Sequence, residues 1–127
     1  MVQRETRREV HNFRKMRIYG EALQLVTEVY ELTRKLPHDE AFGLTSQLRR
    51  AAVSVVLNIA EGSGASTNQE FLRFLDIARR SIYEINACLA ICTRINVLAP
   101  VDCRAIVSNA DALAAMISRF RSRLAAG

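Results

Sequence analysis

The sequence predicts an all-α protein, folded as an antiparallel up-down-up-down four-helix bundle. Apolar residues recur three and four positions apart in four successive stretches, which is the period of a helix that buries one face. The 127 residues contain only 5 glycines and 2 prolines, too few for the turns of a many-stranded β fold. The connections between the stretches are short, and short connections join antiparallel neighbours. Half of the residues are hydrophobic, which is enough for one packed core.

The first predicted helix begins near Phe13 and ends before Pro37, because the residue before a proline avoids the helical region. One apolar seam follows its length in steps of four and three and consists of Ile18, Ala22, Leu25, Val29, Leu32 and Leu36. A second seam lies beside it and consists of Tyr19, Leu23, Val26 and Tyr30. Two seams offer more apolar surface than one neighbouring helix covers, so we expect the second to contribute to a subunit interface.

The second predicted helix follows a connector at residues 38–43 and runs to about Glu61. Its middle, residues 51–60, is apolar nearly all round, which is typical of a helix buried on most sides. The exception is a narrow polar line at Gln47, Arg50, Ser54, Asn58 and Glu61. Ser54 and Asn58 either hydrogen-bond across a subunit interface and fix its register, or face solvent or a polar residue of the same chain.

A loop at residues 62–66 separates the second and third helices. Gly62 is expected at the position after the helix end, where a positive φ favours glycine. Ser66 and Thr67 each begin a capping box, so the third helix starts there, and its apolar pattern lasts to about Ile95. The loop follows a helix and lacks the lysine of a P-loop, so we do not expect a dedicated phosphate site in it.

The fourth predicted helix starts at Pro100, whose missing N–H is harmless in a first helical turn. Its apolar seam comprises Cys103, Ile106, Ala110, Leu113, Ile117, Phe120 and Leu124. The three cysteines, Cys88, Cys92 and Cys103, are expected to be buried thiols. An odd number of cysteines fits a reducing compartment, and a zinc site would lack a fourth ligand nearby.

The chain is basic, and its basic residues are clustered. Lys and Arg number 18 against 13 acidic residues, a net charge of +5, and Lys15 and Lys35 are the only lysines. Residues 1–17 hold six basic and two acidic side chains, and residues 119–123 add three arginines. In an antiparallel bundle the start of the first helix and the end of the fourth share one end, so we expect one basic pole. We interpret residues 1–12 as a flexible basic arm and residues 13–127 as the bundle domain.

Several classes of protein are disfavoured. No stretch approaches the ~18 apolar residues of a membrane span, and residues 1–15 lack the apolar region of a secretory signal, so we expect a cytoplasmic protein. No Glu-x-x-His pair or nucleophile–base arrangement is present, and Glu61 and Glu84 are expected to partner arginines or helix ends. Aromatic residues make up 6%, too few for stacking platforms along a single strand. We expect no enzyme, metal or cofactor.

Three segments resemble a known family: GLTSQLRRAA at 43–52, NIAEGSG at 58–64 and EFLRFLDIA at 70–78. The chain resembles the bacterial four-helix-bundle family named for proteins encoded in intervening sequences of 23S rRNA genes. It is similar also to the accessory protein of diversity-generating retroelements. The resemblance covers roughly residues 13–98 and implies a homopentameric ring with a basic surface for nucleic acid. In the retroelement branch it implies a reverse transcriptase as protein partner.

We therefore predict a non-enzymatic, ring-forming bundle that binds RNA, DNA or a hybrid, as an accessory to a nucleic-acid enzyme. Arginine suits this task because its planar fork matches phosphate oxygens. The expected phosphate contacts are Arg4, Arg7, Arg8, Arg14, Arg17, Arg49, Arg50, Arg79, Arg80, Arg119, Arg121 and Arg123. The expected subunit interface comprises Tyr19, Leu23, Val26, Tyr30, Ser54 and Asn58. The alternative is a protein–protein scaffold for an acidic partner, without direct nucleic-acid contact.

Overall fold

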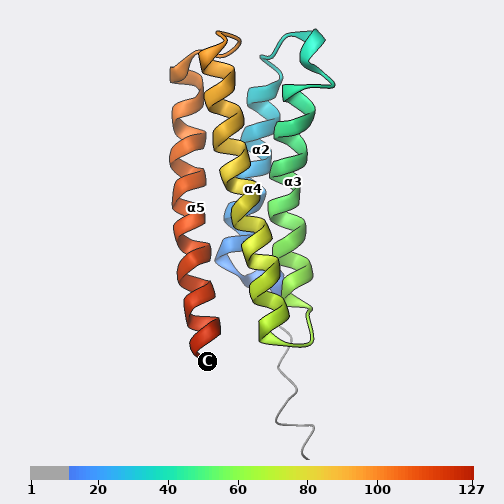
Figure 1. Ribbon diagram of the computed structural model, residues 1–127, viewed down its shortest axis with the longest axis vertical. Helices are drawn as coiled ribbons and strands as arrows, with labels where there is room; N and C mark the ends of the chain where they lie inside the picture. The colour runs from blue at the N-terminus through green and yellow to red at the C-terminus, as the bar shows by residue number, and fades with distance from the viewer. Residues whose placement is uncertain (1–11) are drawn as a thin grey trace, which may run out of the picture.

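The computed structural model describes residues 12–127, which form helices and no strand. The predicted arm at residues 1–12 therefore lies, apart from Asn12, outside the described residues. Four long helices run alternately up and down (Figure 1), which confirms the predicted bundle. In chain order the elements are η1 (Phe13–Lys15), α2 (Arg17–Thr33), η2 (His38–Glu40), α3 (Leu44–Ser63), α4 (Asn68–Arg94) and α5 (Pro100–Ala126).

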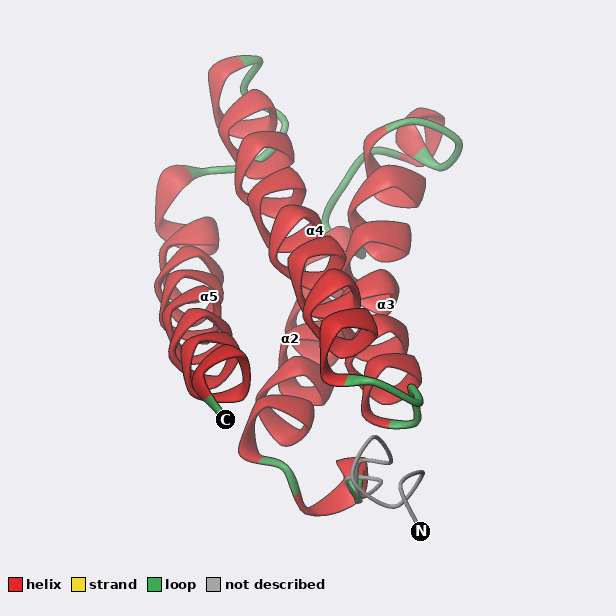
Figure 2. Cartoon of the chain, turned by 60° about the horizontal axis from the view of Figure 1, so that its bottom comes forward, coloured by secondary structure: helices red, strands yellow, loops and turns green. Residues whose placement is uncertain are grey.

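Each long helix packs against two others, in the order α2, α3, α4, α5 and back to α2. The closed square places α2 beside α5, although these helices are the most distant in sequence (Figure 2). The start of α2, the end of α3, the start of α4 and the end of α5 share one end of the molecule. We call it the C-terminal end of the bundle, and it is where the predicted basic pole should lie.

The core follows the predicted apolar seams. All six residues of the first predicted seam are buried, and Leu25 is only 1% exposed. Five of them lie on α2, whereas Leu36 follows it, because the helix ends at Thr33 and not just before Pro37. Burial of a leucine side chain contributes about 1.5–3 kcal/mol to folding. The second seam stays outside the core, with Leu23 44% exposed and Tyr19, Val26 and Tyr30 half-buried. The second seam is thus only partly covered within the chain, and its part in a subunit interface stays a prediction.

Helix α3 is less enclosed than its composition predicts. Val55 and Ile59 are fully buried, but Leu57 is 52% exposed and Val53 is half-buried. The physical reason is the bundle geometry, because α3 has only α2 and α4 as long-helix neighbours and its outer face meets neither. The expectation that α3 is buried on most sides is therefore wrong for the single chain.

Gly62 does not play the predicted part. Helix α3 continues through it to Ser63, and no glycine among residues 12–127 has a positive φ. Gly62 is buried, and a Cβ atom added there would stand 2.7 Å from Cδ1 of Phe71 and 2.8 Å from Cβ of Phe74. The position thus needs glycine for the close approach of α4.

The two ends of α4 are fixed by local hydrogen bonds. At the start, the Thr67 hydroxyl oxygen accepts from the Glu70 N–H at 3.1 Å, which confirms the predicted cap. At the other end Asn96 adopts a φ of 63°, and the Val97 N–H donates to the Cys92 carbonyl at 3.0 Å. This is the Schellman arrangement, in which asparagine takes the place more often held by glycine.

Candidate nucleic-acid interface

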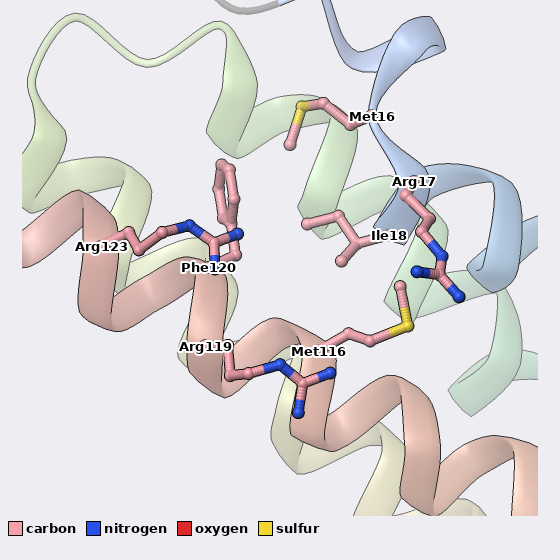
Figure 3. Close-up of a pocket in the computed structure, with 7 residues that line it drawn as sticks. All are labelled: Met16, Arg17, Ile18, Met116, Arg119, Phe120 and Arg123. Atoms are coloured by element: carbon pink, nitrogen blue, oxygen red, sulfur yellow. The ribbon is translucent and has the colours of Figure 1, made fainter.

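A hollow of about 300 Å³ opens at the C-terminal end of the bundle, between the start of α2 and the end of α5. We call it the arginine hollow (Figure 3). Three of its residues come from the start of α2 and four from one face of α5, where steps of three and four place side chains together. Its lining consists of Met16, Arg17, Ile18, Met116, Arg119, Phe120 and Arg123.

The hollow is positively charged and apolar at once. Arg17, Arg119 and Arg123 are exposed, and none of them forms an ion pair within residues 12–127. No carboxylate from this part of the chain lines the hollow. The Arg123 Cζ lies 6.0 Å from the centre of the Phe120 ring, a cation–π contact that turns the guanidinium toward the hollow's apolar side. The sequence prediction that both termini of the bundle bring arginines to one end is confirmed for these three residues.

Two other predicted phosphate contacts are engaged within the chain. Asp76 accepts from Nε and Nη2 of Arg121 at 2.7 and 3.1 Å, and from Nη2 of Arg79 at 3.3 Å. Arg79 also donates to the Ser118 hydroxyl at 3.0 Å. The hydrogen bond from Arg121 is the main cause that lowers the pKa of Asp76 below its usual value. Arg79 and Arg121 therefore tie α4 to α5 and are partly neutralised.

Two further predicted arginines among the described residues, Arg14 and Arg80, differ in their surroundings. Arg14, on η1, stacks over the Phe13 ring, with its Cζ 4.7 Å from the ring centre. Arg80 is exposed and forms no ion pair within residues 12–127. The last three predicted arginines lie outside the described residues: Arg4, Arg7 and Arg8.

A second concavity, of about 620 Å³, lies along the outer face of α3. We call it the α3 groove. Arg49 lies over the Tyr30 ring at 4.4 Å and donates from Nε to the Thr33 hydroxyl at 2.9 Å, whereas Arg50 is exposed. The groove is lined by Tyr30, Ala41, Phe42, Thr45, Ser46, Arg49, Arg50, Val53, Ser54, Leu57, Asn58 and Glu61. It brings together three of the six predicted interface residues, and the other three lie on α2: Tyr19, Leu23 and Val26.

The polar line of α3 finds partners within the chain. The Asn58 amide donates to the Ser54 carbonyl at 2.8 Å and to its hydroxyl at 3.0 Å, and the Ser81 hydroxyl donates to Ser54 Oγ at 2.9 Å. Within the described chain these hydrogen bonds join Ser54 to Asn58 and Ser81, and a part for Ser54 and Asn58 in a subunit interface stays a prediction. Gln47 donates to Glu84, so the expectation of an arginine partner for Glu84 is wrong.

The three cysteines are free thiols and are buried, as predicted. Burial raises the pKa of Cys92 to about 11 and also raises the pKa values of Cys88 and Cys103. A raised pKa favours the protonated thiol, which is a weaker nucleophile than the thiolate. Across residues 12–127, no three His, Cys, Asp or Glu side chains gather as metal ligands. The same residues contain no helix long and apolar enough to cross a membrane.

Sequence reasoning missed two parts of the site. Of the apolar floor of the arginine hollow, Ile18 and Phe120 were assigned to core seams and Met16 and Met116 were not singled out. Met116, Arg119, Phe120 and Arg123 nevertheless share one helical face in the sequence. Asp76 was not recognised as a partner of Arg79, although the pair has the i, i+3 spacing of a helical ion pair. The link from Asp76 to Arg121 depends on the register of α4 against α5, which no local signal reveals.

Comparisons with known proteins agree with this architecture. Residues 14–119 match the family model described as 23S rRNA-intervening sequence protein. Among solved structures, a protein of unknown function from the S23 ribosomal protein family of Bacteroides thetaiotaomicron superposes with a TM-score of 0.73. The two chains are 17% identical over 82% of this chain and 97% of that chain, so this likeness concerns the fold. No curated protein matches the chain.

Proposed function

The chain belongs to the 23S rRNA-intervening sequence protein family, and from this premise we propose that it is a non-enzymatic, nucleic-acid-binding bundle of the cytoplasm. The contact surface we propose is the C-terminal end of the bundle, centred on the arginine hollow. The bound species is RNA, DNA or an RNA–DNA hybrid. In this role the protein would serve as an accessory to a nucleic-acid enzyme, for which a reverse transcriptase is the example that the resemblance suggests.

One observation carries the proposal: three exposed arginines from two distant parts of the chain surround one hollow without a carboxylate from residues 12–127. Arginines that serve only solubility or folding are commonly interspersed with acids, as Arg79 and Arg121 are with Asp76. Arg17, Arg119 and Arg123 instead leave their donors free for an anionic partner. Phosphate oxygens match these forks bidentately.

The proposed binding reads the backbone and not the bases. The sequence contains no zinc finger, aromatic RNP motif or GXXG clamp that would read base edges. Contacts to phosphates displace condensed counterions, so affinity falls steeply as salt rises. We therefore expect weak dependence on sequence and strong dependence on ionic strength.

Self-association belongs to the same proposal. The α3 groove exposes Phe42 completely and Leu57 by 52%, and the second seam of α2 exposes Leu23 by 44%. Large apolar side chains gathered on one face favour a protein–protein interface. A homopentameric ring, which the family resemblance suggests, would repeat the basic end around one axis and multiply its charge.

The test is fluorescence anisotropy of labelled duplex RNA, duplex DNA and a hybrid, at low and physiological salt. The triple variant Arg17→Gln, Arg119→Gln and Arg123→Gln should bind at least about tenfold more weakly, and its plot of log affinity against log salt should be shallower by about 3. The control carries Arg34→Gln, Arg94→Gln and Arg104→Gln, which remove the same charge from exposed positions near the opposite end. It should retain most of the affinity.

Two results would contradict the proposal. Equal losses in both triple variants would mean that only the net charge matters. No binding even at low salt would favour the alternative, a scaffold whose arginines meet the carboxylates of an acidic protein. A pull-down of partners that survives nuclease treatment would then be the supporting observation.

A further inference from the structure

We propose that the arginine hollow binds the terminal nucleotide of a nucleic-acid strand, with its terminal phosphomonoester held by Arg17, Arg119 and Arg123. This inference rests on the proposed function and specifies which part of the strand the C-terminal end of the bundle recognises. The structural basis is the union of three guanidinium groups and an apolar floor in one small hollow.

The charge of the hollow fits a phosphomonoester better than an internal phosphodiester. A phosphomonoester carries about −1.5 to −2 charges at pH 7, whereas each internal phosphate carries one. None of the three arginines pairs with a carboxylate of residues 12–127. Arg121, on the same stretch of α5, is already held by Asp76 at 2.7 Å. The three remaining guanidiniums can share one doubly charged phosphomonoester. A singly charged diester would neutralise less of their combined positive charge.

The floor of the hollow suits a nucleobase. Ile18 is buried, and Met16, Met116 and Phe120 are half-buried, so part of each lies open to the hollow. Figure 3 shows Ile18 and Met116 between Arg17 of α2 and the arginines of α5, with Phe120 beside Arg123. Thioethers make favourable contacts with aromatic rings, so Met16 and Met116 suit the ring of a base. The phosphate-binding and base-binding parts therefore adjoin one another.

The size of the hollow favours a strand end. About 300 Å³ is at the lower limit of small-molecule sites, a size that suits one nucleotide and not a track of bases. An internal nucleotide would have to leave the hollow in two directions, whereas a terminal nucleotide needs a path for only one chain.

The experiment compares one single-stranded oligonucleotide, labelled internally, in three forms: with a 5′-phosphate, with a 3′-phosphate and with hydroxyls at both ends. We expect one phosphorylated form to bind about tenfold more tightly than the hydroxyl form in anisotropy titrations at physiological salt, because a further charge-assisted contact is worth that factor. Which form gains identifies the terminus. Arg119→Gln with Arg123→Gln should abolish the preference, and Arg94→Gln with Arg104→Gln should preserve it.

The outcomes separate this inference from the function on which it rests. Equal affinity for all three forms, together with arginine-dependent duplex binding, would overturn the terminal-nucleotide site and leave the proposed function standing. A preference that persists in the Arg119 and Arg123 double variant would overturn the assignment to this hollow. Absence of binding to strands and duplexes alike, even at low salt, would overturn both.

Discussion

Gly62 lies where the last turn of α3 passes the start of α4, and its hydrogen occupies the place of any other residue's Cβ atom. In Gly62→Ala, that atom would stand 2.7 Å from the ring of Phe71, which is fully buried, and 2.8 Å from Cβ of Phe74. Neither neighbour is the end of a flexible chain. We expect the free energy of unfolding to fall by about 1–3 kcal/mol, more than the gain of about 1 kcal/mol in helix propensity.

Gly20 provides the matched control for this substitution. It lies within α2, is exposed, and has no atom within 4 Å of an added Cβ. Gly20→Ala should therefore raise the free energy of unfolding by up to about 1 kcal/mol. Urea unfolding of both variants at one fixed protein concentration measures the contrast. If both alanines stabilise the protein, the close approach of α4 to Gly62 is not present in solution.

Individual residues differ in how far the sequence predicts their structural role. The seams of the helices are periodic, so the burial of Leu25, Val29 and their equivalents is predictable from the sequence. The roles of Gly62 and Asn96 are not predictable in this way. A glycine near a helix end can serve either a positive φ or a close contact with a neighbouring helix. The neighbouring helix decides between them. Here the close contact applies to Gly62, and Asn96 takes the positive φ.

At the scale of the elements, α5 is fastened to α4 by Asp76. Replacement of Asp76 by Asn removes the charge that Arg121 and Arg79 share, and we expect the free energy of unfolding at pH 7 to fall by about 1 kcal/mol. Because Arg121 lowers the pKa of Asp76 in the folded state, the stabilisation is complete above the unfolded value of about 3.8. It is lost as the pH falls through the lower folded pKa.

Urea unfolding of wild-type and Asp76→Asn proteins at pH 7, 5 and 3 tests this pH dependence. The difference should be full at pH 7 and 5 and should begin to close at pH 3, which lies below the unfolded pKa of about 3.8, because the unfolded carboxyl then binds a proton that the folded carboxyl resists. Asp39→Asn is the control, since Asp39 is exposed on η2 and forms no ion pair within residues 12–127. A difference that is unchanged from pH 7 to pH 3 would exclude the charge as its source.

The elements themselves were largely predictable. Apolar periodicity, Pro37, the Thr67 cap and Pro100 place all four long helices and their order. The exposure of one face of α3 was not predictable, because composition reports how apolar a helix is and not how many neighbours it has. The same limit explains the arginines: spacing identifies a basic face, but the partner across a helix pair, such as Asp76 for Arg121, depends on register.

For the molecule as a whole, the up-and-down topology is what makes the basic end predictable from the sequence. An even number of antiparallel helices returns the chain to the end where it began, so Arg17 and Arg123 must share that end. The hollow between them depends on the spacing of α2 and α5 at that end, and apolar periodicity in the sequence does not predict this spacing. The family resemblance is confirmed by the match over residues 14–119.

One chain leaves the outer faces of α2 and α3 exposed. We expect wild-type protein to show a light-scattering mass that is a multiple of 14.3 kDa, because contact with another copy would bury the exposed side chains of Phe42, Leu57 and Leu23. Leu57→Glu should weaken association at least about tenfold, since it would bury an unpaired carboxylate. Its mass should approach 14.3 kDa at low concentration.

The control for assembly is Ala112→Glu, which adds the same charge at an exposed position of α5 outside the α3 groove. It should keep the wild-type mass, and the melting temperature should rise with protein concentration in both the control and the wild type but not in Leu57→Glu. A wild-type mass of one chain at all concentrations would refute self-association. The arginine hollow of each bundle would then act alone, and the salt dependence of nucleic-acid binding would report about three phosphate contacts and not a multiple of three.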